Sequence, residues 1–560
     1  MMSGKKKWGV LTIVLSSAAL LLCLFIWRER SFTVLDITVD GQTVSNVRLI
    51  EQRLPFGVEK VMQGAEYTVF DIDWQDDGKG EGKYLFLPGS IDLSKVYARV
   101  SYAGDVEEGV GFDMIPLKKD EICYVGEVKL GNHTISVGEE SLRLGIMRGS
   151  KLPVLWIDTA ESMDFIHESR DNTTTGTLRV ISAEGDVESI NQVETLKGRG
   201  NSSWSMVKKS YGIKLEENIS LLGMTPGKTW VLSGGGGDVT GIRNKLFLDM
   251  ALGCGLQNAI EAQWADLYIN GSYYGCYLLA EKITVADGRL EIGDLEKNTE
   301  LLNEESIDKY PYCTIEENGL QYSGYSVPAQ PEDWSGGYLL EMEKYESRYV
   351  EAPSRFSTNT QTLVIQNPTH ATLEQAQYIA HFVRGFEEAL CALSGYNAAG
   401  NYYLDYIYLD SFVTRYIIDE ISKNIDAGYS SYFLYKPQGD DRLYAGPVWD
   451  YDTALGNNLG WGDEKVLKEP TGMFMNTSNW SAKLWQKLEF QERVREIFQE
   501  SFIPYLERLM AFGLEDYIQT IQESVAMEQI CCGRENLEEE NQYLREFLKA
   551  RVDFLMDELG

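Results

Sequence analysis

Histidine and cysteine, which supply many catalytic and metal-binding sites, are scarce in this chain of 560 residues. None of the four histidines lies near the acidic motifs described below, and the chain contains neither Gly-x-Ser-x-Gly nor His-Glu-x-x-His. These absences argue against hydrolases that use either motif. The eight cysteines include no Cys-x-x-Cys pair and are too few for a disulfide scaffold, so no structural zinc site is expected.

Positive charge is also scarce. Lys and Arg number 51 against 85 Asp and Glu, which gives a formal net charge of −34. Such a surface repels phosphate backbones, so nucleic acid is not an expected partner. Hydrophobic residues make up 44% and charged residues 24% of the chain, which is typical of a globular protein and argues against collagen, coiled coil and disorder. The length predicts roughly three or four domains.

The first thirty residues differ from the rest. Three lysines precede an uncharged run from Trp8 to Trp27, whose 20 residues are about the number needed to span a bilayer. A cleaved signal peptide would have a shorter apolar core and a small-x-small exit, and a buried core helix would not follow a terminal lysine cluster. We therefore expect residues 1–31 to form a cytoplasmic stub and an uncleaved signal-anchor transmembrane helix. The protein would be a single-pass cell-membrane protein with the bulk of the chain extracellular.

Residues 32–150 alternate short apolar runs with turn signals. Phe32–Val39 and Val96–Ser101 are two such runs, and Asp40-Gly41 and Gly131-Asn132 are typical turn dipeptides. The pattern predicts an antiparallel, β-sandwich-like module. It contains no cluster of catalytic residue types, so the expected role is that of a stalk or an adhesive module.

Beyond this module the chain is first β-rich and then α-rich. Asn270-Gly271 lies between two apolar runs and predicts a hairpin, whereas residues 294–335 are polar and turn-rich and predict a long loop or insertion. Apolar residues recur at helical spacing after about Thr372. We expect an α+β unit with a β-rich N-lobe and an α-rich C-lobe over residues 151–480, completed by a helical part at 481–560.

The first candidate site is a glycine-containing loop. Two glycines flank an arginine and small polar residues follow, so backbone N–H groups and a guanidinium could approach a phosphate. A tight β-turn explains the same pattern equally well. Because the loop lies between strands and lacks Gly-Lys-Ser/Thr, it is not a Walker loop. The residues are Gly198, Arg199, Gly200, Asn201 and Ser202.

A strand lysine follows this loop. Lys214 alternates with apolar residues in Tyr211–Leu215 and therefore points to the face opposite them. From there it could reach nucleotide phosphates. A solvated strand lysine is the plainer interpretation, and Lys208 and Lys209 compete for the same role.

An acidic motif in two parts carries more weight. Asp426 ends a helix and enters a loop. Asp450, 24 residues later, and Asp452 lie at the end of a strand. In phosphoryl transfer, one carboxylate orients or deprotonates a hydroxyl, and a second group holds Mg²⁺ against nucleotide phosphates. The motif fits that plan, although the chain has no His-Arg-Asp and no Asp-Phe-Gly, and acidic pairs are common in so acidic a chain.

These pieces, taken in order, resemble the CotH (spore coat protein H) kinase family, secreted atypical kinases with a reduced protein-kinase-like fold. The resemblance covers about residues 150–557. Each piece alone is a weak signal, whereas the ordered set is specific. The matching segments are Gly198–Ser202, Lys209–Lys214, Arg243-Asn244, Ile269–Gly275 with Glu281, Gly336–Glu341, Asn424 with Asp426, Trp449–Asp452 and the helix of Arg551.

The resemblance implies a role for each candidate. Asp426 resembles the catalytic aspartate and Asp450 the metal-binding aspartate, with Asp452 as a second ligand or supporting group. Ser431 stands where kinases have an asparagine that binds the second metal ion, and a hydroxyl is a poorer Mg²⁺ ligand. The implied cofactors are ATP and Mg²⁺ or Mn²⁺. The implied nucleotide-binding residues are Gly198–Ser202, Lys214 and Glu281.

The resemblance also implies an activity. We expect a two-lobed atypical protein-kinase-like fold and a membrane-anchored extracellular kinase that transfers the γ-phosphoryl group of ATP to Ser or Thr of cell-surface or spore-coat proteins. One alternative is a non-catalytic envelope or spore-coat structural protein on a pseudokinase-like scaffold, which the acidic surface, the 32–150 module and Ser431 favour. Another is nucleotidyl transfer on the same fold.

Overall fold

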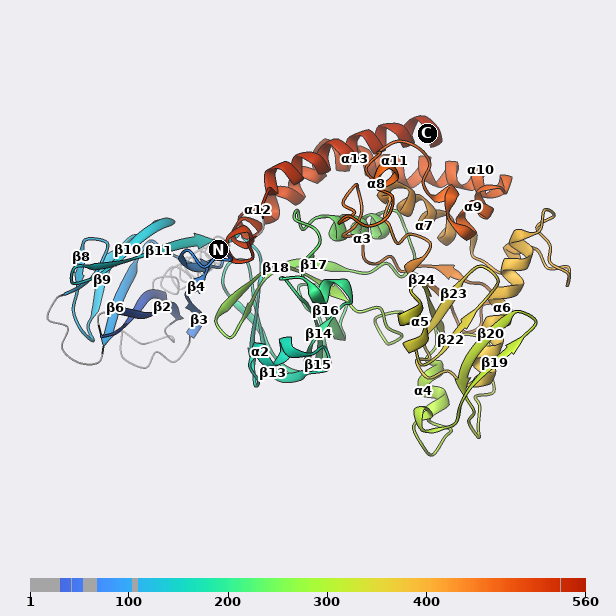
Figure 1. The fold of residues 1–560 in the computed structure, drawn as a ribbon, viewed down its shortest axis with the longest axis horizontal. Coiled ribbons are helices and arrows are strands. Elements are labelled where there is room, and N and C mark those ends of the chain that lie inside the picture. The colour runs from blue at the N-terminus through green and yellow to red at the C-terminus, as the bar shows by residue number, and fades with distance from the viewer. Residues whose placement is uncertain (1–30, 42, 54–67, 103–108, 534) are drawn as a thin grey trace, which may run out of the picture.

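The computed structural model of the protein describes residues 31–41, 43–53, 68–102, 109–533 and 535–560. It is a mixed α+β structure in which two N-terminal sheets, a closed β-barrel and a seven-stranded sheet follow one another along the long axis (Figure 1). Helices of the C-terminal half cover the seven-stranded sheet. Among them, α12 (Leu514–Cys531) packs against the barrel, and α13 (Leu537–Leu559) runs from there back over the other helices.

The N-terminal module consists of two sheets that share one hydrophobic core. The strand orders are β3-β2-β1-β6-β9 and β4-β5-β11-β10-β7-β8. Leu49 of one sheet and Leu144 of the other are fully buried in the same core cluster, so apolar side chains hold the two faces together. The strands are β1 (Ser31–Asp40), β2 (Thr43–Arg53), β3 (Thr68–Asp73), β4 (Gln75–Asp76), β5 (Lys83–Leu87), β6 (Val96–Tyr102), β7 (Val110–Phe112), β8 (Ile115–Leu117), β9 (Ile122–Gly126), β10 (Gly131–Val137) and β11 (Glu140–Arg148).

Two pairings differ from the antiparallel arrangement predicted for this module. Strand β1 runs parallel to β6, and β5 runs parallel to β11. Parallel neighbours need a crossover connection, and the alternation of side chains along a strand does not say which distant strand pairs with it. The turn at Asp40-Gly41 is confirmed, because Gly41 has a φ of 64° between β1 and β2. Gly131-Asn132 instead opens β10.

The β-rich part that follows is a closed barrel with the strand order β12-β13-β14-β15-β16-β18-β17. The predicted hairpin at Asn270-Gly271 joins β17 and β18, and both residues have positive φ (51° and 85°), as a type I′ turn requires. Trp230 and Leu267 are fully buried among the side chains that fill the barrel. The strands are β12 (Val154–Thr159), β13 (Thr173–Ile181), β14 (Val187–Arg199), β15 (Ser210–Ile219), β16 (Gly227–Ser233), β17 (Ala262–Ile269) and β18 (Ser272–Glu281).

A seven-stranded sheet comes next, with the order β19-β20-β22-β23-β21-β24-β25. Of the two interpretations of residues 294–335, a long loop or an insertion, the long loop was wrong, because this segment supplies helix α4 and the hairpin β19–β20. An edge strand such as β19 is largely exposed and needs few apolar residues, so its composition is that of a loop. The elements are α4 (Leu295–Glu300), β19 (Tyr312–Glu317), β20 (Leu320–Tyr325), β21 (Tyr338–Glu343), β22 (Arg355–Ser357), β23 (Thr362–Asn367), β24 (Ser430–Lys436) and β25 (Tyr444–Ala445).

The helical character predicted after about Thr372 is confirmed by α6 and α7. Helix α6 (Leu373–Cys391) packs against β20 and starts with a capping box, in which Thr372 and Gln375 exchange side-chain to main-chain hydrogen bonds. Helix α7 (Leu409–Ser422) is buried on almost every side, as suits a central helix. Further helices are α3 (Arg243–Gly253), α5 (Glu346–Glu351), α9 (Asn479–Trp485), α10 (Leu488–Ile497) and α11 (Ile503–Arg508).

Two predictions that rested on the N-terminal run are corrected. No helix among the described residues combines the length and the apolar character that crossing a membrane requires. The predicted span from Trp8 to Trp27 lies outside the described residues. The transmembrane part of the predicted fold class and the single-pass cell-membrane location are therefore not retained. An apolar run shows that a segment is long enough to span a bilayer, but not that it does so.

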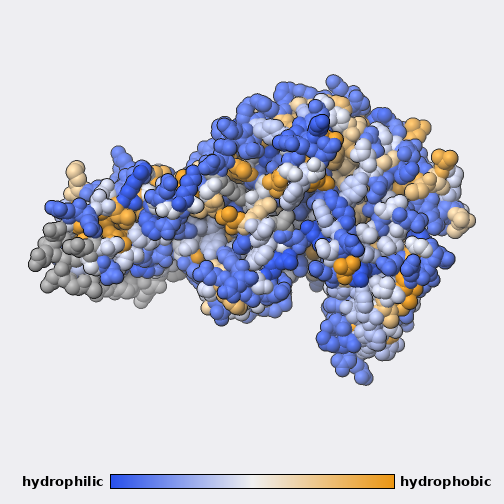
Figure 2. Space-filling model, in the orientation of Figure 1, coloured by the Kyte–Doolittle hydropathy of each residue, from blue (hydrophilic) through white to orange (hydrophobic). Residues whose placement is uncertain are grey.

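Hydrophilic residues dominate the face seen in Figure 2, where hydrophobic residues appear as small, separate patches. This surface accords with a net charge of −34, because most of the 85 carboxylates can remain solvated. On the same face the surface has an indentation between the barrel and the seven-stranded sheet (Figure 2).

Candidate functional site

Asp426 and Asp450 come from separate loops that meet at one end of the seven-stranded sheet. Asp426 lies between α7 and β24, and Asp450 follows β25. The side-chain amide of Asn424 donates to the main-chain oxygen of Asp450 (2.9 Å), and its Oδ1 accepts from the hydroxyl of Thr453 (2.9 Å). The structure thus joins the two parts of the predicted acidic motif.

Buried groups on α7 hold the loop that carries Asp450. Arg415 donates to the carbonyl oxygen of Pro447 (3.1 Å) and to Asp419 (2.8 Å), and the hydroxyl of Tyr451 donates to Asp419 (2.5 Å). Asp419 is fully buried, so these partners are needed to compensate its desolvation. Helix α7 therefore sets the position of the segment on either side of Asp450.

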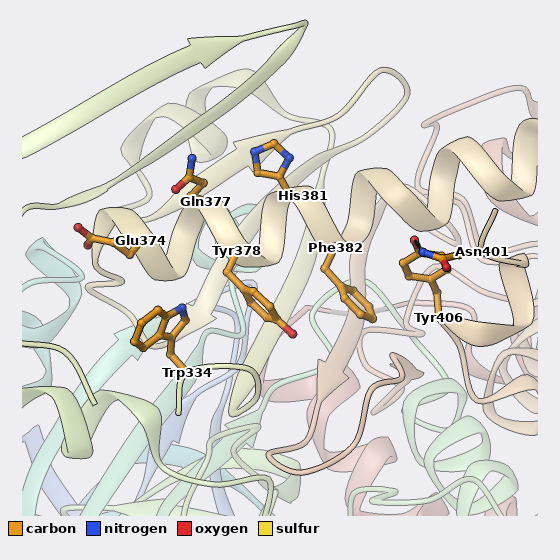
Figure 3. A pocket seen from close by; sticks show the side chains of 8 residues that line it. All are labelled: Trp334, Glu374, Gln377, Tyr378, His381, Phe382, Asn401 and Tyr406. Carbon is orange, nitrogen blue, oxygen red and sulfur yellow. Dashed lines mark hydrogen bonds between the residues drawn. The ribbon is translucent and has the colours of Figure 1, made fainter. Parts of the chain in front are cut away.

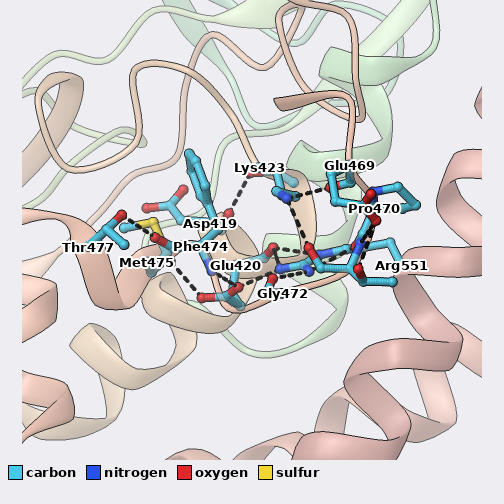
Figure 4. A network of polar contacts seen from close by, with 12 residues as sticks. Asp419, Glu420, Lys423, Glu469, Pro470, Gly472, Phe474, Met475, Thr477 and Arg551 are labelled. Carbon is cyan, nitrogen blue, oxygen red and sulfur yellow. Dashed lines mark hydrogen bonds and ion pairs between the residues drawn. The ribbon is translucent and has the colours of Figure 1, made fainter. Parts of the chain in front are cut away.

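A second buried network anchors the C-terminal end of α7 (Figure 4). Arg551 of α13 donates to the main-chain oxygen of Glu420 (2.6 Å) and forms an ion pair with its carboxylate, and both side chains are fully buried. The Glu420 carboxylate also accepts from the N–H groups of Phe474 (2.5 Å) and Met475 (2.7 Å). Because the Asp426 loop starts at this helix end, α13 contributes to its placement from far along the chain.

Two residues of the site have a left-handed backbone. The angle φ is 68° at Asp450 and 49° at Ser431. Residues other than glycine adopt this region rarely, at a cost of about 1–3 kcal/mol, and such strain gathers at functional sites. The Ser431 hydroxyl is near enough to the Asp450 carboxylate to lower its pKa.

Asp450 lies among charged groups of both signs. Its side chain reaches solvent, yet protein surrounds it, and this desolvation raises its pKa. The charge of Asp426 raises the pKa of Asp450 further, whereas Arg199, Arg348 and the nearby Ser431 hydroxyl lower it. Because two carboxylates at close range ionise together only at a cost, this arrangement favours a cation between them.

Asp452 and Glu341 extend the acidic side of the site. Burial raises the pKa of Asp452, and the charge of Asp450 adds to the effect. Burial also raises the pKa of Glu341, to about 7, although Gln366 donates to its carboxylate (2.6 Å). Carboxyl groups whose pKa values are raised by burial and by one another are typical of functional sites.

The barrel supplies positive charge through the end of β14. The Arg199 guanidinium lies over the ring of Trp449, 5.3 Å from its centroid, and its charge acts on Asp450 and Glu341. A guanidinium offers planar, paired N–H donors that suit carboxylate and phosphate oxygens. The predicted loop therefore faces the predicted acidic motif.

The rest of this loop is shaped by its glycines. A Cβ at Gly198 would lie 2.0 Å from the ring of Trp204, so only glycine lets that ring pack. Gly200 has a φ of 91°, which glycine adopts without strain. The side chain of Asn201 accepts from Arg170 (2.9 Å), and the backbone of Ser202 starts a short 3₁₀ turn.

Lys214 and Glu281 are placed elsewhere. Lys214 forms an exposed ion pair with Glu194 (2.6 Å), and Glu281 pairs with Arg289 (2.7 Å). Neither is among the groups that act most strongly on Asp450. The structure does not bring them to the acidic cluster, and their nucleotide contacts stay predictions.

Three cations near the site were not predicted. Lys344 Nζ lies 3.1 Å from Asp426 Oδ1, and Arg348 of α5 acts on Asp450. Lys282 lies near Arg199, and burial together with that like charge lowers the pKa of Lys282. Lys344 and Arg348 occupy a polar segment without a periodic pattern, so no sequence signal marks them.

The residues present fit a divalent cation held jointly with nucleotide phosphates. Mg²⁺ usually takes one or two protein carboxylates and completes its shell with phosphate and water oxygens. Asp426 Oδ1 is buried, and apart from the Lys344 ammonium 3.1 Å away it has no hydrogen-bond partner among the described residues. Within the same part of the chain, no group of three or more His, Cys, Asp or Glu side chains forms a ready-made metal site. Asp426 and Asp450 would therefore need the phosphates to complete the shell.

Comparison with known proteins agrees with the order of the motifs. The family model described as CotH kinase protein matches residues 196–555, which is more than half of the chain. A search of the curated proteins found no match. The matched range runs from the Arg199 loop through both acidic motifs to the helix of Arg551, so the chain belongs to the CotH kinase protein family.

Proposed function

We propose that this protein transfers the γ-phosphoryl group of ATP to Ser or Thr side chains of spore-coat proteins. The observation that carries the proposal is the meeting of Asp426 and Asp450 from two loops, opposite Arg199 from the barrel. Membership of the CotH kinase family supports a kinase-like activity and an association with the spore coat.

The proposed reaction assigns one task to each group. Asp426 accepts the proton of the acceptor hydroxyl while the oxygen of that hydroxyl bonds to the γ-phosphorus. The bond between the γ-phosphorus and the oxygen that bridges it to ADP breaks, and ADP is released. Mg²⁺ or Mn²⁺, when bound by Asp450 with Asp452 and Ser431 beside it, supplies neutralisation of the phosphate charge. Arg199 presents its guanidinium to phosphate oxygens from the barrel side.

The Lys344 ammonium gives the acceptor side a further cation. It lies against the Asp426 carboxylate and over the rings of Tyr345 (5.1 Å) and Tyr429 (5.6 Å). These contacts hold a positive charge where the acceptor hydroxyl and the γ-phosphate would meet. Such a charge favours the extra negative charge of the transition state over the ground state.

The proposal is tested by label transfer from γ-labelled ATP, with Mg²⁺ or Mn²⁺, to a Ser/Thr-rich acceptor protein. Asp426→Ala and Asp450→Ala are each expected to lower the rate by about 100-fold or more, because each removes a group that acts in the transition state. Asp557→Ala, at an exposed position of α13, is the matched control and should leave the rate unchanged. Labelling that survives both site substitutions would contradict the assigned roles.

Two other functions make different predictions for the same preparation. Ser431, in the place of a metal-binding asparagine, favours a non-catalytic scaffold, which would show neither label transfer nor a nucleotide-dependent rise in melting temperature. Nucleotidyl transfer would place label from α-labelled ATP on the acceptor. A positive result with γ-labelled ATP alone distinguishes the proposed phosphoryl transfer from both.

A further inference from the structure

A cavity of about 660 Å³ opens along one side of α6, and none of the residues assigned to the candidate site lines it. Its walls come from α6, from the segment that precedes β21 and from the segment between α6 and α7 (Figure 3). Cavities of roughly 300–1,000 Å³ are the size of ordinary small-molecule sites. Its place in the fold makes it separate from the proposed phosphoryl-transfer site.

A continuous aromatic wall forms one side of this cavity. The rings of Tyr378 and Phe382 are 6.3 Å apart, and those of Phe382 and Tyr406 are 5.2 Å apart, centroid to centroid. Trp334 lies next to Tyr378 from a different segment of the chain (Figure 3). Ring faces offer broad, flat apolar area with little loss of conformational freedom on binding.

The wall is held rigid by hydrogen bonds. The hydroxyl of Tyr406 accepts from the side-chain amides of Asn397 (2.9 Å) and Asn401 (3.0 Å). The main-chain oxygen of Trp334 accepts from the hydroxyl of Tyr338 (2.7 Å). Because these groups are fixed before a ligand arrives, little binding energy would be lost in ordering them.

Planar polar side chains flank the rings. Gln377, His381 and Glu374 project from α6 on the same cavity, and Asn401 lies at its other end (Figure 3). Amide groups both donate and accept, and the carboxylate accepts. A ligand with alternating apolar faces and hydroxyl edges would satisfy the rings and these groups at the same time.

The charges around the cavity argue against an ionic ligand. The buried Lys436 ammonium already lies over the rings of Phe382 (5.0 Å) and Tyr378 (5.9 Å), which weakens the attraction of these rings for a second cation. Glu374 on the lining, and Glu317 bonded to His381 (2.8 Å), would repel an anion. The observations favour a neutral ligand.

We propose that this cavity binds a neutral oligosaccharide of about two or three sugar rings, as its volume allows. The C–H faces of the sugars would stack on Trp334, Tyr378 and Tyr406. Their hydroxyl groups would bond to Gln377 and Asn401. The inference goes beyond the proposed kinase activity and does not rest on it.

Calorimetric titration of the full chain with neutral trisaccharides of glucose, N-acetylglucosamine and mannose tests the proposal. At least one is expected to bind with one-to-one stoichiometry. Trp334→Ala should weaken that binding by about tenfold or more, since ring stacking is lost. Trp461→Ala, which removes a 44% exposed tryptophan outside the cavity, is the matched control and should not change it. Gln377→Ala and Asn401→Ala replace exposed polar residues and give a second measurement if Trp334→Ala fails to fold.

Several outcomes would overturn the proposal. One is the absence of heat from every trisaccharide up to about 10 mM, where a site with millimolar Kd would be nearly filled. Another is binding that Trp334→Ala, Gln377→Ala and Asn401→Ala all leave unchanged. A third is binding of a tri-arginine peptide in place of the sugars, which would show a cation site. Asp450→Ala should bind the sugar as the wild type does, so loss of kinase activity cannot be mistaken for loss of this site.

Discussion

The side-chain amide of Asn424 donates to the main-chain oxygen of Asp450 at 2.9 Å and so joins two loops that are distant in the sequence. Its Oδ1 at the same time accepts from Thr453 at 2.9 Å. One buried side chain thus holds the proposed metal-binding carboxylate in register with Asp426, two residues further along its own loop. This bond is a positioning contact, because Asn424 needs no contact of its own with substrate.

Asn424→Ala should lower phosphoryl transfer by about 10- to 100-fold, because a small displacement of reacting groups is enough to cost that much. The free energy of unfolding should fall by about 1–3 kcal/mol, since buried partners lose their hydrogen bonds. Rates with γ-labelled ATP and urea unfolding measure the two effects. Asn303→Ala is the control, because it removes side-chain hydrogen bonds to the main-chain oxygens of Thr299 and Ala329, away from the site. Equal loss of rate in both variants would contradict a positioning role.

Gly198→Ala should destabilise the Arg199 loop. The added Cβ would lie 2.0 Å from the Trp204 ring, so the ring or the strand must move, at a cost of about 1–3 kcal/mol. Gly212→Ala, on the strand paired with β14, is the matched control because a Cβ there meets nothing within 4 Å. Thermal melting and the KM for ATP should both change in the first variant only. A Gly198→Ala protein that melts like the wild type would show that the ring has room to shift.

Arg551→Met should be the most destabilising of these changes. It leaves the fully buried Glu420 carboxylate without its cation, and breaking a buried pair costs about 3–5 kcal/mol. Lys549→Met breaks an exposed pair with Asp553 on the same helix and should have little effect. Because Glu420 precedes the Asp426 loop, activity should fall in Arg551→Met even where the protein is still folded. Similar melting temperatures for the two variants would refute this account of the network.

The pH dependence of stability should reflect Asp266, a fully buried residue of β17. Burial raises its pKa from 3.8 to about 7, although Ser524 and Tyr273 donate to it. Between those two pKa values, the folded protein keeps the Asp266 proton that the unfolded chain has lost. The stability that this proton contributes is therefore present in full below about pH 4 and is lost as pH rises through about 7. The shift corresponds to roughly 4 kcal/mol at most.

Asp266→Asn mimics the protonated side chain and should flatten this dependence. Urea unfolding between about pH 5 and pH 8 should show a smaller decline in the variant than in the wild type. Asp557→Asn, at an exposed position, should decline as the wild type does. If the stability of Asp266→Asn declines with pH as much as that of the wild type and of Asp557→Asn, the titrating group is not Asp266.

Local chemistry explains which features could be predicted. The hairpin at Asn270-Gly271 follows from two residues that tolerate positive φ, and α6 follows from a helical apolar pattern behind a capping box. The edge hairpin β19–β20 was missed because an exposed strand pairs through its backbone and needs no apolar pattern. The parallel pairing of β1 with β6 was missed because it depends on a crossover.

The residues of the candidate site also include some that local sequence could predict and others that it could not. Asp426 and Asp450 could be predicted because a carboxylate after a helix and another after a strand form an ordered motif. Lys344 and Arg348 could not, because their segment has no periodicity and becomes part of the site only when β21 pairs with β24. Lys214 shows the converse: its position on a strand suited phosphate contact, yet in the fold it pairs with Glu194 at the surface.

The amino-acid sequence was sufficient to predict the acidic, globular character of the chain, the change from β-rich to α-rich, the ordered motifs and the two carboxylates proposed for chemistry. Each of these depends on residue type and on neighbours close in the chain. The tertiary structure alone decided which cations meet those carboxylates, how Arg551 supports the end of α7, and that aromatic side chains of α6 form a cavity with Trp334 and Tyr406. These features depend on contacts between distant segments, which form only when burial of apolar surface brings the segments together.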